Sequence, residues 1–179
     1  MIFDDAILRE IGIFQYGIVE AKDIVFANEV RRLCERNLCR NYGITWACPP
    51  AVGTVEECKA KCMEYDEGLV FSGKYDLEDS FDYEGMVNGL KEFKKVCDRL
   101  YALAKEKSFD FMLFSNEGCQ RCDSCTYPDN PCRYPDKLFP SVESFGIMVP
   151  LLANSAKINY INGAGTVTYF GMLLYKKEA

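Results

Sequence analysis

The length and composition of the chain place it among soluble globular proteins. Its 179 residues are 49% hydrophobic and 27% charged, which suits a single domain spanning residues 1–179 and excludes an intrinsically disordered chain. With 21 basic and 27 acidic residues the net charge is -6, which opposes binding to nucleic acid and to anionic membranes.

The N-terminal residues and the cysteine content bear on the compartment. Residues 1–6 lack the basic and apolar regions of a signal peptide, and no apolar run reaches the roughly 18 residues that cross a bilayer. We therefore expect a cytoplasmic protein with no membrane contact. In a reducing compartment the ten cysteines are expected to be metal ligands and core residues rather than disulfides.

Two elements are predicted before the first group of cysteines. Residues 11–20 are rich in apolar and aromatic side chains without helix signals, which predicts a strand. Asn28 stands at an N-cap position, and the helix that it would begin carries Val30, Leu33 and Cys34 on one face. Cys34 is therefore either a core thiol or a ligand at the end of this helix.

The first group of cysteines has the pattern C-x4-C-x2-Y-x3-W-x-C-P-P over residues 34–50. The two prolines hold the backbone after Cys48 extended and so fix the direction of its thiolate. Cys39 is the second candidate ligand, and Tyr42 and Trp46 are placed to shield a metal site from water. The alternative interpretation is a buried tight turn with Trp46 in the core and no metal.

Thr54 and Glu57 form the capping-box pattern of a helix predicted over residues 55–66. Cys62 lies on the apolar stripe of this helix and is expected in the core. Cys58 lies on the same stripe, and it is also within reach of a site built from the first group of cysteines. It is therefore a further candidate ligand.

A strand, a helix and a second strand are predicted in the middle of the chain. The strands are residues 68–73 and 109–115, and the helix, residues 85–107, carries apolar residues every three or four positions with Cys97 among them. This pattern predicts that the two strands are parallel partners with a right-handed crossover, and that the helix packs across them.

The second group of cysteines has the pattern C-x2-C-x2-C-x6-C and consists of Cys119, Cys122, Cys125 and Cys132. Three thiolates at successive spacings of three can surround an iron–sulfur core, and the fourth can close the shell. Zinc is the alternative, although zinc sites usually use two separated C-x2-C pairs or histidines, and the chain has no histidine. A reduced loop without metal is the third interpretation, but its thiols would be open to oxidation.

The surroundings of this run leave two points open. Arg121 and Arg133 are placed to supply positive charge to a cluster whose net charge with four thiolates is about -2, or they are ordinary surface arginines. The last interval is longer than in the bacterial ferredoxin run. If Cys132 is not a ligand, one iron is open to substrate, and an enzyme becomes conceivable.

The last third of the chain completes the expected fold. It predicts a helix over residues 140–155 that is broken near Gly146, and a hairpin of two strands at 157–161 and 166–175. The fold class is therefore α/β, with a mixed sheet of about five strands flanked by helices and two cysteine-rich metal-binding loops.

The two cysteine patterns together resemble the family called domain of unknown function 2284, which is described as predicted metal-binding proteins of prokaryotes. The resemblance runs from about Phe26 to Tyr175. It implies metal binding and leaves the reaction open. By motif match it implies six ligands, with Cys34 and Cys58 left open as further ones: Cys39, Cys48, Cys119, Cys122, Cys125 and Cys132.

The leading hypothesis for function is an iron–sulfur protein with one or two [4Fe-4S] clusters, which passes electrons to or from a redox partner protein. The acidic surface would suit a basic patch on that partner. The alternatives are a zinc-binding structural or interaction module, and an enzyme that uses a cluster with an open iron site. Eight cysteines remain outside the expected core positions 62 and 97, which equals two sets of four.

Overall fold

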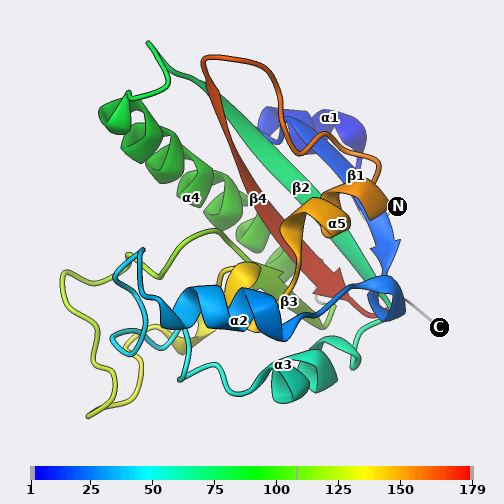
Figure 1. Cartoon of the computed structure of the whole chain (residues 1–179). Helices are drawn as coiled ribbons and strands as arrows, with labels where there is room; N and C mark the ends of the chain where they lie inside the picture. The colour runs from blue at the N-terminus through cyan, green and yellow to red at the C-terminus, as the bar shows by residue number, and fades with distance from the viewer. Residues whose placement is uncertain (1–2, 108, 178–179) are drawn as a thin grey trace.

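Four strands and five α-helices make up the described part of the chain, residues 3–107 and 109–177 of a computed structural model (Figure 1). Within these residues no helix is both long enough and apolar enough to cross a bilayer. The strands are β1 (Gln15–Glu20), β2 (Glu67–Asp76), β3 (Phe111–Phe114) and β4 (Thr166–Tyr175). The helices are α1 (Asp5–Glu10), α2 (Asn28–Glu35), α3 (Val55–Cys62), α4 (Tyr83–Glu106) and α5 (Val149–Ser155), with short 3-10 helices η1 (Ala21–Asp23), η2 (Pro135–Lys137) and η3 (Glu143–Phe145).

The strands form one sheet in the order β1-β2-β4-β3, and every pairing is antiparallel. The central pair, β2 and β4, runs from the Glu67↔Tyr175 pair to the Asp76↔Thr166 pair. The prediction of a mixed sheet of about five strands is therefore wrong in both respects. The assignment of residues 1–179 to one domain stays a prediction.

The strands on either side of α4 also differ from the prediction. β2 and β3 point the same way and belong to one sheet, but β4 lies between them and they are not hydrogen-bonded partners. The strand-helix-strand pattern fixes the direction of the two strands without saying which strand separates them. α4 does cross them as predicted and contacts β2, β4 and β3.

Alternating residues of the central strands supply a core on each face of the sheet. Leu69 and Phe71 of β2 pack with apolar residues of α1 and α4, whereas Val70 packs with residues of α3 and α5 on the opposite face. The expected core thiols are fully buried, Cys97 on the α4 side and Cys62 on the α3 side. The sheet is thus covered on both faces.

Gly17 of β1 lies against the C-terminal end of α5. A Cβ at this position would stand 1.9 Å from the carbonyl oxygen of Ala156. Because the clash is with backbone, β1 or α5 would have to move, and Gly17→Ala should lower the free energy of unfolding by about 2 kcal/mol or more. Urea denaturation measures this loss. Ile18→Ala, at an exposed side chain of the same strand, should cost clearly less, and a Gly17→Ala variant of unchanged stability would contradict this packing.

The predicted strand at residues 157–161 is wrong, because the first two of these residues cap the end of α5 and the rest form a loop. Lys157 takes a left-handed conformation with φ of 57°. Its N–H donates to the carbonyl of Asn154, and the N–H of Ile158 donates to that of Ala153. This is a Schellman motif, which uses the backbone groups that a strand would need. The break predicted near Gly146 is confirmed, since that glycine has φ of 78° and separates η3 from α5.

Two helices near the cysteines begin close to where the sequence predicts. α3 begins at the capping box of Thr54 and Glu57. α2 has Ala27 rather than Asn28 as its N-cap. The predicted apolar face of α2 is not buried, since Leu33 is 56% exposed. Arg31 holds this helix instead, as shown below.

Candidate metal centre

The four C-terminal cysteines line one hollow. After β3 the chain has no helix or strand from residue 116 to 134, and it folds there into a loop beside α4. We call the hollow in this loop the C-terminal hollow. It is lined by Cys119, Cys122, Cys125 and Cys132 together with Arg121, Thr126, Arg133, Tyr134 and Leu138.

Hydrogen bonds within the loop explain how the long last interval still returns Cys132 to the other three. The hydroxyl of Thr126 donates to the carbonyl of Pro131 at 2.8 Å, and the N–H of Asn130 donates to the carbonyl of Thr126 at 3.0 Å. The guanidinium of Arg133 donates to the carbonyl of Ser124 at 2.8 Å. The six intervening residues therefore form a closed turn that brings Cys132 to the same hollow.

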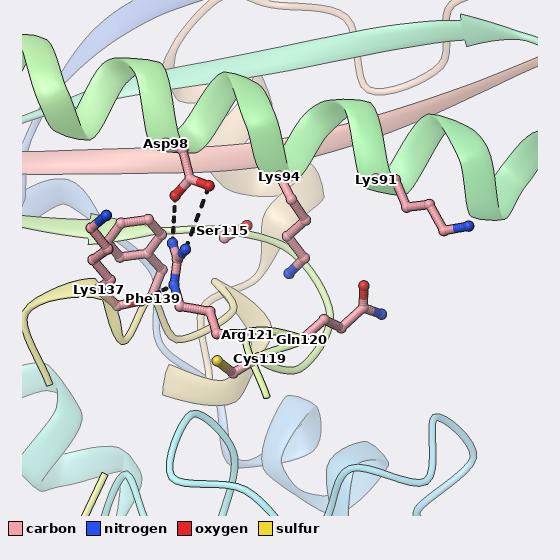
Figure 2. A pocket seen from close by; sticks show the side chains of 9 residues that line it. All are labelled: Lys91, Lys94, Asp98, Ser115, Cys119, Gln120, Arg121, Lys137 and Phe139. Atoms are coloured by element: carbon pink, nitrogen blue, oxygen red, sulfur yellow. Dashed lines mark hydrogen bonds and ion pairs between the residues drawn. The ribbon is translucent and has the colours of Figure 1, made fainter. Parts of the chain in front are cut away.

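Arg121 fastens the loop to the helix behind it. Its guanidinium pairs with Asp98 of α4, donates to the carbonyl of Lys137 and lies 4.7 Å from the ring centroid of Phe139. Figure 2 shows the guanidinium below Asp98 and beside the ring of Phe139. Because Asp98 already pairs with its charge, the main role of Arg121 is to hold the loop against α4. Burial raises the pKa of the Cys119 thiol, and the backbone and the charge of Arg121 partly offset this rise.

Three of the four N-terminal candidates line a second hollow of about 170 Å³, which we call the N-terminal hollow. Cys34 comes from the end of α2, Cys39 from the following turn and Cys48 from the segment before Pro49. The remaining lining residues are Tyr42, Pro49, Glu117, Gly118, Ser141, Glu143 and Ser144.

Burial keeps two of these thiols protonated in the absence of a metal. It raises the pKa of the Cys48 thiol to about 11, and it also raises the pKa of Cys34. Buried apolar surroundings disfavour a free thiolate. These sulfurs therefore become ligands only when a metal ion takes the place of their protons. Metal binding at this hollow should therefore release protons.

The two hollows are adjacent because the two cysteine segments contact each other. The indole N–H of Trp46 donates to the carbonyl of Asn130 at 3.1 Å, and its ring packs edge-on against Tyr127 at 4.9 Å. A Cβ on Gly118 would stand 2.5 Å from the side-chain oxygen of Asn41, so only a glycine fits there without a shift. Trp46 therefore joins the two segments rather than filling the core.

Lys94 of α4 lies close to the segment that leads from β3 to Cys119. Its ammonium donates to the backbone carbonyls of Asn116, Glu117 and Gly118. Burial lowers the pKa of Lys94, whereas Cys119 of one hollow and Cys48 of the other are among the groups that raise it. A cation at this point would stabilise negative charge at either hollow.

Lys94 also lines a third hollow of about 220 Å³, which opens onto Cys119 (Figure 2). We call it the basic hollow. Four basic side chains and one acidic one line it, although the whole chain carries a net charge of -6. Its residues are Lys91, Lys94, Asp98, Ser115, Cys119, Gln120, Arg121, Lys137 and Phe139.

The structure separates the predicted site residues into three sets. The four C-terminal cysteines share one hollow, Cys34, Cys39 and Cys48 share another, and Cys58 lies in the core with no exposed surface. Sequence reasoning missed Lys94, Glu117 and Glu143. Lys94 follows a core phenylalanine on an amphipathic helix, and neither glutamate belongs to a recognisable motif, so the sequence carried no signal for them.

The donor chemistry of the hollows fits a thiophilic metal. Thiolates select zinc and iron–sulfur clusters, and zinc also accepts a carboxylate beside cysteines. In residues 3–107 and 109–177, however, no group of three or more His, Cys, Asp or Glu side chains is gathered closely enough to hold one ion. The thiols line the hollows without meeting at one point, so they would have to move closer together to share one ion.

Comparison with known families agrees with this chemistry. A family described as predicted metal-binding protein (DUF2284) matches residues 17–175, which is most of the chain. The chain belongs to the DUF2284 family. The match begins nine residues before the resemblance that the cysteine motifs indicated and ends at the same residue. No curated protein and no solved structure matches this DUF2284 chain.

Proposed function

We propose that this DUF2284 protein is an iron–sulfur protein that passes single electrons to and from a partner protein. The C-terminal hollow would hold a [4Fe-4S] cluster on Cys119, Cys122, Cys125 and Cys132. The observation that carries the proposal is that all four thiols of the C-x2-C-x2-C-x6-C run line one hollow. A cluster bound there would supply a one-electron redox couple.

The charges around the hollow suit a bound group with a net negative charge, such as a cluster. A cubane on four thiolates has a net charge of about -2 and is stabilised by nearby cations and N–H donors. Lys94 and Arg133 lie close to the cysteines, and the basic hollow opens onto Cys119. Zinc on the same four cysteines is the competing proposal, and it favours a structural role without electron transfer.

The surrounding residues would then hold the loop in one conformation while the cluster gains and loses an electron. Arg121 fixes the loop to α4, and the Thr126 and Arg133 bonds close the turn before Cys132. The cysteines are only half-buried, which would leave one side of the cluster near the surface for a partner. The acidic surface of the chain favours a partner with a basic docking patch.

A reductive titration of anaerobically purified protein tests this role. We expect a broad absorption band in the blue region that bleaches on reduction, with uptake of about one electron per cluster and a paramagnetic reduced state. A colourless protein that contains zinc and takes up no electrons would replace the proposal with the zinc module.

A further inference from the structure

We infer that the N-terminal hollow is a separate site for a single divalent ion, with Cys34, Cys39, Cys48 and the carboxylate of Glu143 as ligands. The site goes beyond the proposed cluster and does not depend on it. Zinc is the ion that such a set of three thiolates and one carboxylate suits best, in tetrahedral geometry.

The position of the donors supports this set. The three cysteines belong to α2 and the segment after it, whereas Glu143 begins η3, far along the chain. The thiol of Cys34 lies 3.9 Å from the backbone carbonyl oxygen of Glu143, so the end of α2 contacts the start of η3. The sulfurs and the carboxylate therefore reach one hollow from two sides.

The charge of the Glu143 carboxylate is the second argument for this set. Glu143 lines the hollow, is half-buried, and makes no ion pair among the residues that the structure describes. The basic side chain that influences it, Lys94, already donates to three backbone carbonyls. The Ser141 hydroxyl and the backbone N–H of Glu143 itself favour the charged carboxylate but do not neutralise it. A bound metal would supply the opposite charge that a carboxylate withdrawn from water lacks. Glu117 lines the same hollow but is exposed, so water can solvate it.

Cys58 is excluded as the fourth ligand by its own contacts. It is completely buried and does not line the hollow. Its thiol donates to the carbonyl of Val52 at 3.5 Å, and the guanidinium of Arg31 lies 3.9 Å from its sulfur. A cation at this sulfur would have to displace the positive charge of Arg31. The geometry therefore favours Glu143 over Cys58 as the fourth ligand.

The test uses the full chain with Cys122→Ala and Cys125→Ala, which disables the C-terminal hollow whatever it binds. Zinc alone is titrated in competition with a chromophoric chelator. We expect about one zinc per chain, and Glu143→Gln in this background should weaken zinc binding at least tenfold. The matched controls Glu29→Gln, at an exposed carboxylate of α2, and Cys58→Ala should change the affinity less than about threefold.

Two further measurements keep the result independent of folding. Thermal melting without metal should show Glu143→Gln to be as stable as its parent, because glutamine keeps the length of the side chain and an oxygen that accepts hydrogen bonds. X-ray absorption at the zinc edge should show three sulfurs at about 2.3 Å and one oxygen at about 2.0–2.2 Å. Four sulfur ligands, loss of binding in Cys58→Ala alone, or no zinc binding by the parent would each overturn the inference.

Discussion

Replacing Cys122 with alanine will remove nearly all of the metal held by the C-terminal hollow, which we expect to be about four irons per chain. Cys122 is the middle member of the three thiols spaced three residues apart, and it lines the hollow with the other three cysteines. A shell that lacks one thiolate leaves an iron exposed and binds the cluster poorly. Iron and acid-labile sulfide should fall together, at least tenfold, when they are measured per chain in anaerobically purified protein.

Ser124→Ala is the matched control for this variant. Ser124 lies in the same loop, and the bond that it accepts from Arg133 goes to its backbone carbonyl, which alanine retains. Its iron content should equal that of the unmodified protein. If Cys122→Ala kept its full iron and sulfide, the assignment of the cluster to the C-terminal hollow would be wrong.

Arg31→Ala will cause a large loss of stability, of about 3 kcal/mol. The guanidinium of Arg31 donates to the carbonyl of Gly53 at 2.6 Å and to that of Ser144 at 2.9 Å. It thereby ties α2 to the entry of α3 and to η3. Hydrogen bonds from a charged donor contribute about 1.5–3 kcal/mol each, and Ser144 is buried, so its carbonyl would be left without a partner.

Arg32→Ala is the natural comparison, because it removes the same side chain from the next position of α2. Arg32 is exposed and pairs only with the exposed Glu29. Such a pair contributes about 0.5 kcal/mol or less. Urea unfolding of both variants gives the two values, and similar losses for Arg31→Ala and Arg32→Ala would show that Arg31 does not hold α2 in place.

The elements that the sequence predicts well are those with strong local signals. α3 follows from its capping box, and α4 follows from an apolar stripe that recurs over six turns. β2, β3 and β4 follow from short apolar runs between turn residues. The sheet order could not be predicted in this way, because the placement of β4 between β2 and β3 depends on contacts between residues far apart in the chain.

The same distinction between local signals and long-range contacts applies to the candidate site. Spacing alone grouped the C-terminal cysteines, and the structure brings all four to one hollow. Spacing could not distinguish the roles of Cys58 and Cys34. Cys58 is buried in the core, whereas Cys34 lines the N-terminal hollow. It also could not find Lys94 or Glu143, since these residues approach the cysteines through the tertiary fold and not through a motif.

The most direct test of the central claim is the iron, acid-labile sulfide and zinc content per chain of anaerobically purified, full-length protein. Element analysis and a sulfide assay on the same sample give all three values. The proposed cluster predicts about four irons and about four sulfides per chain, with at most about one zinc from the N-terminal hollow. A preparation without sulfide, in which zinc fills the C-terminal cysteines, would contradict the claim.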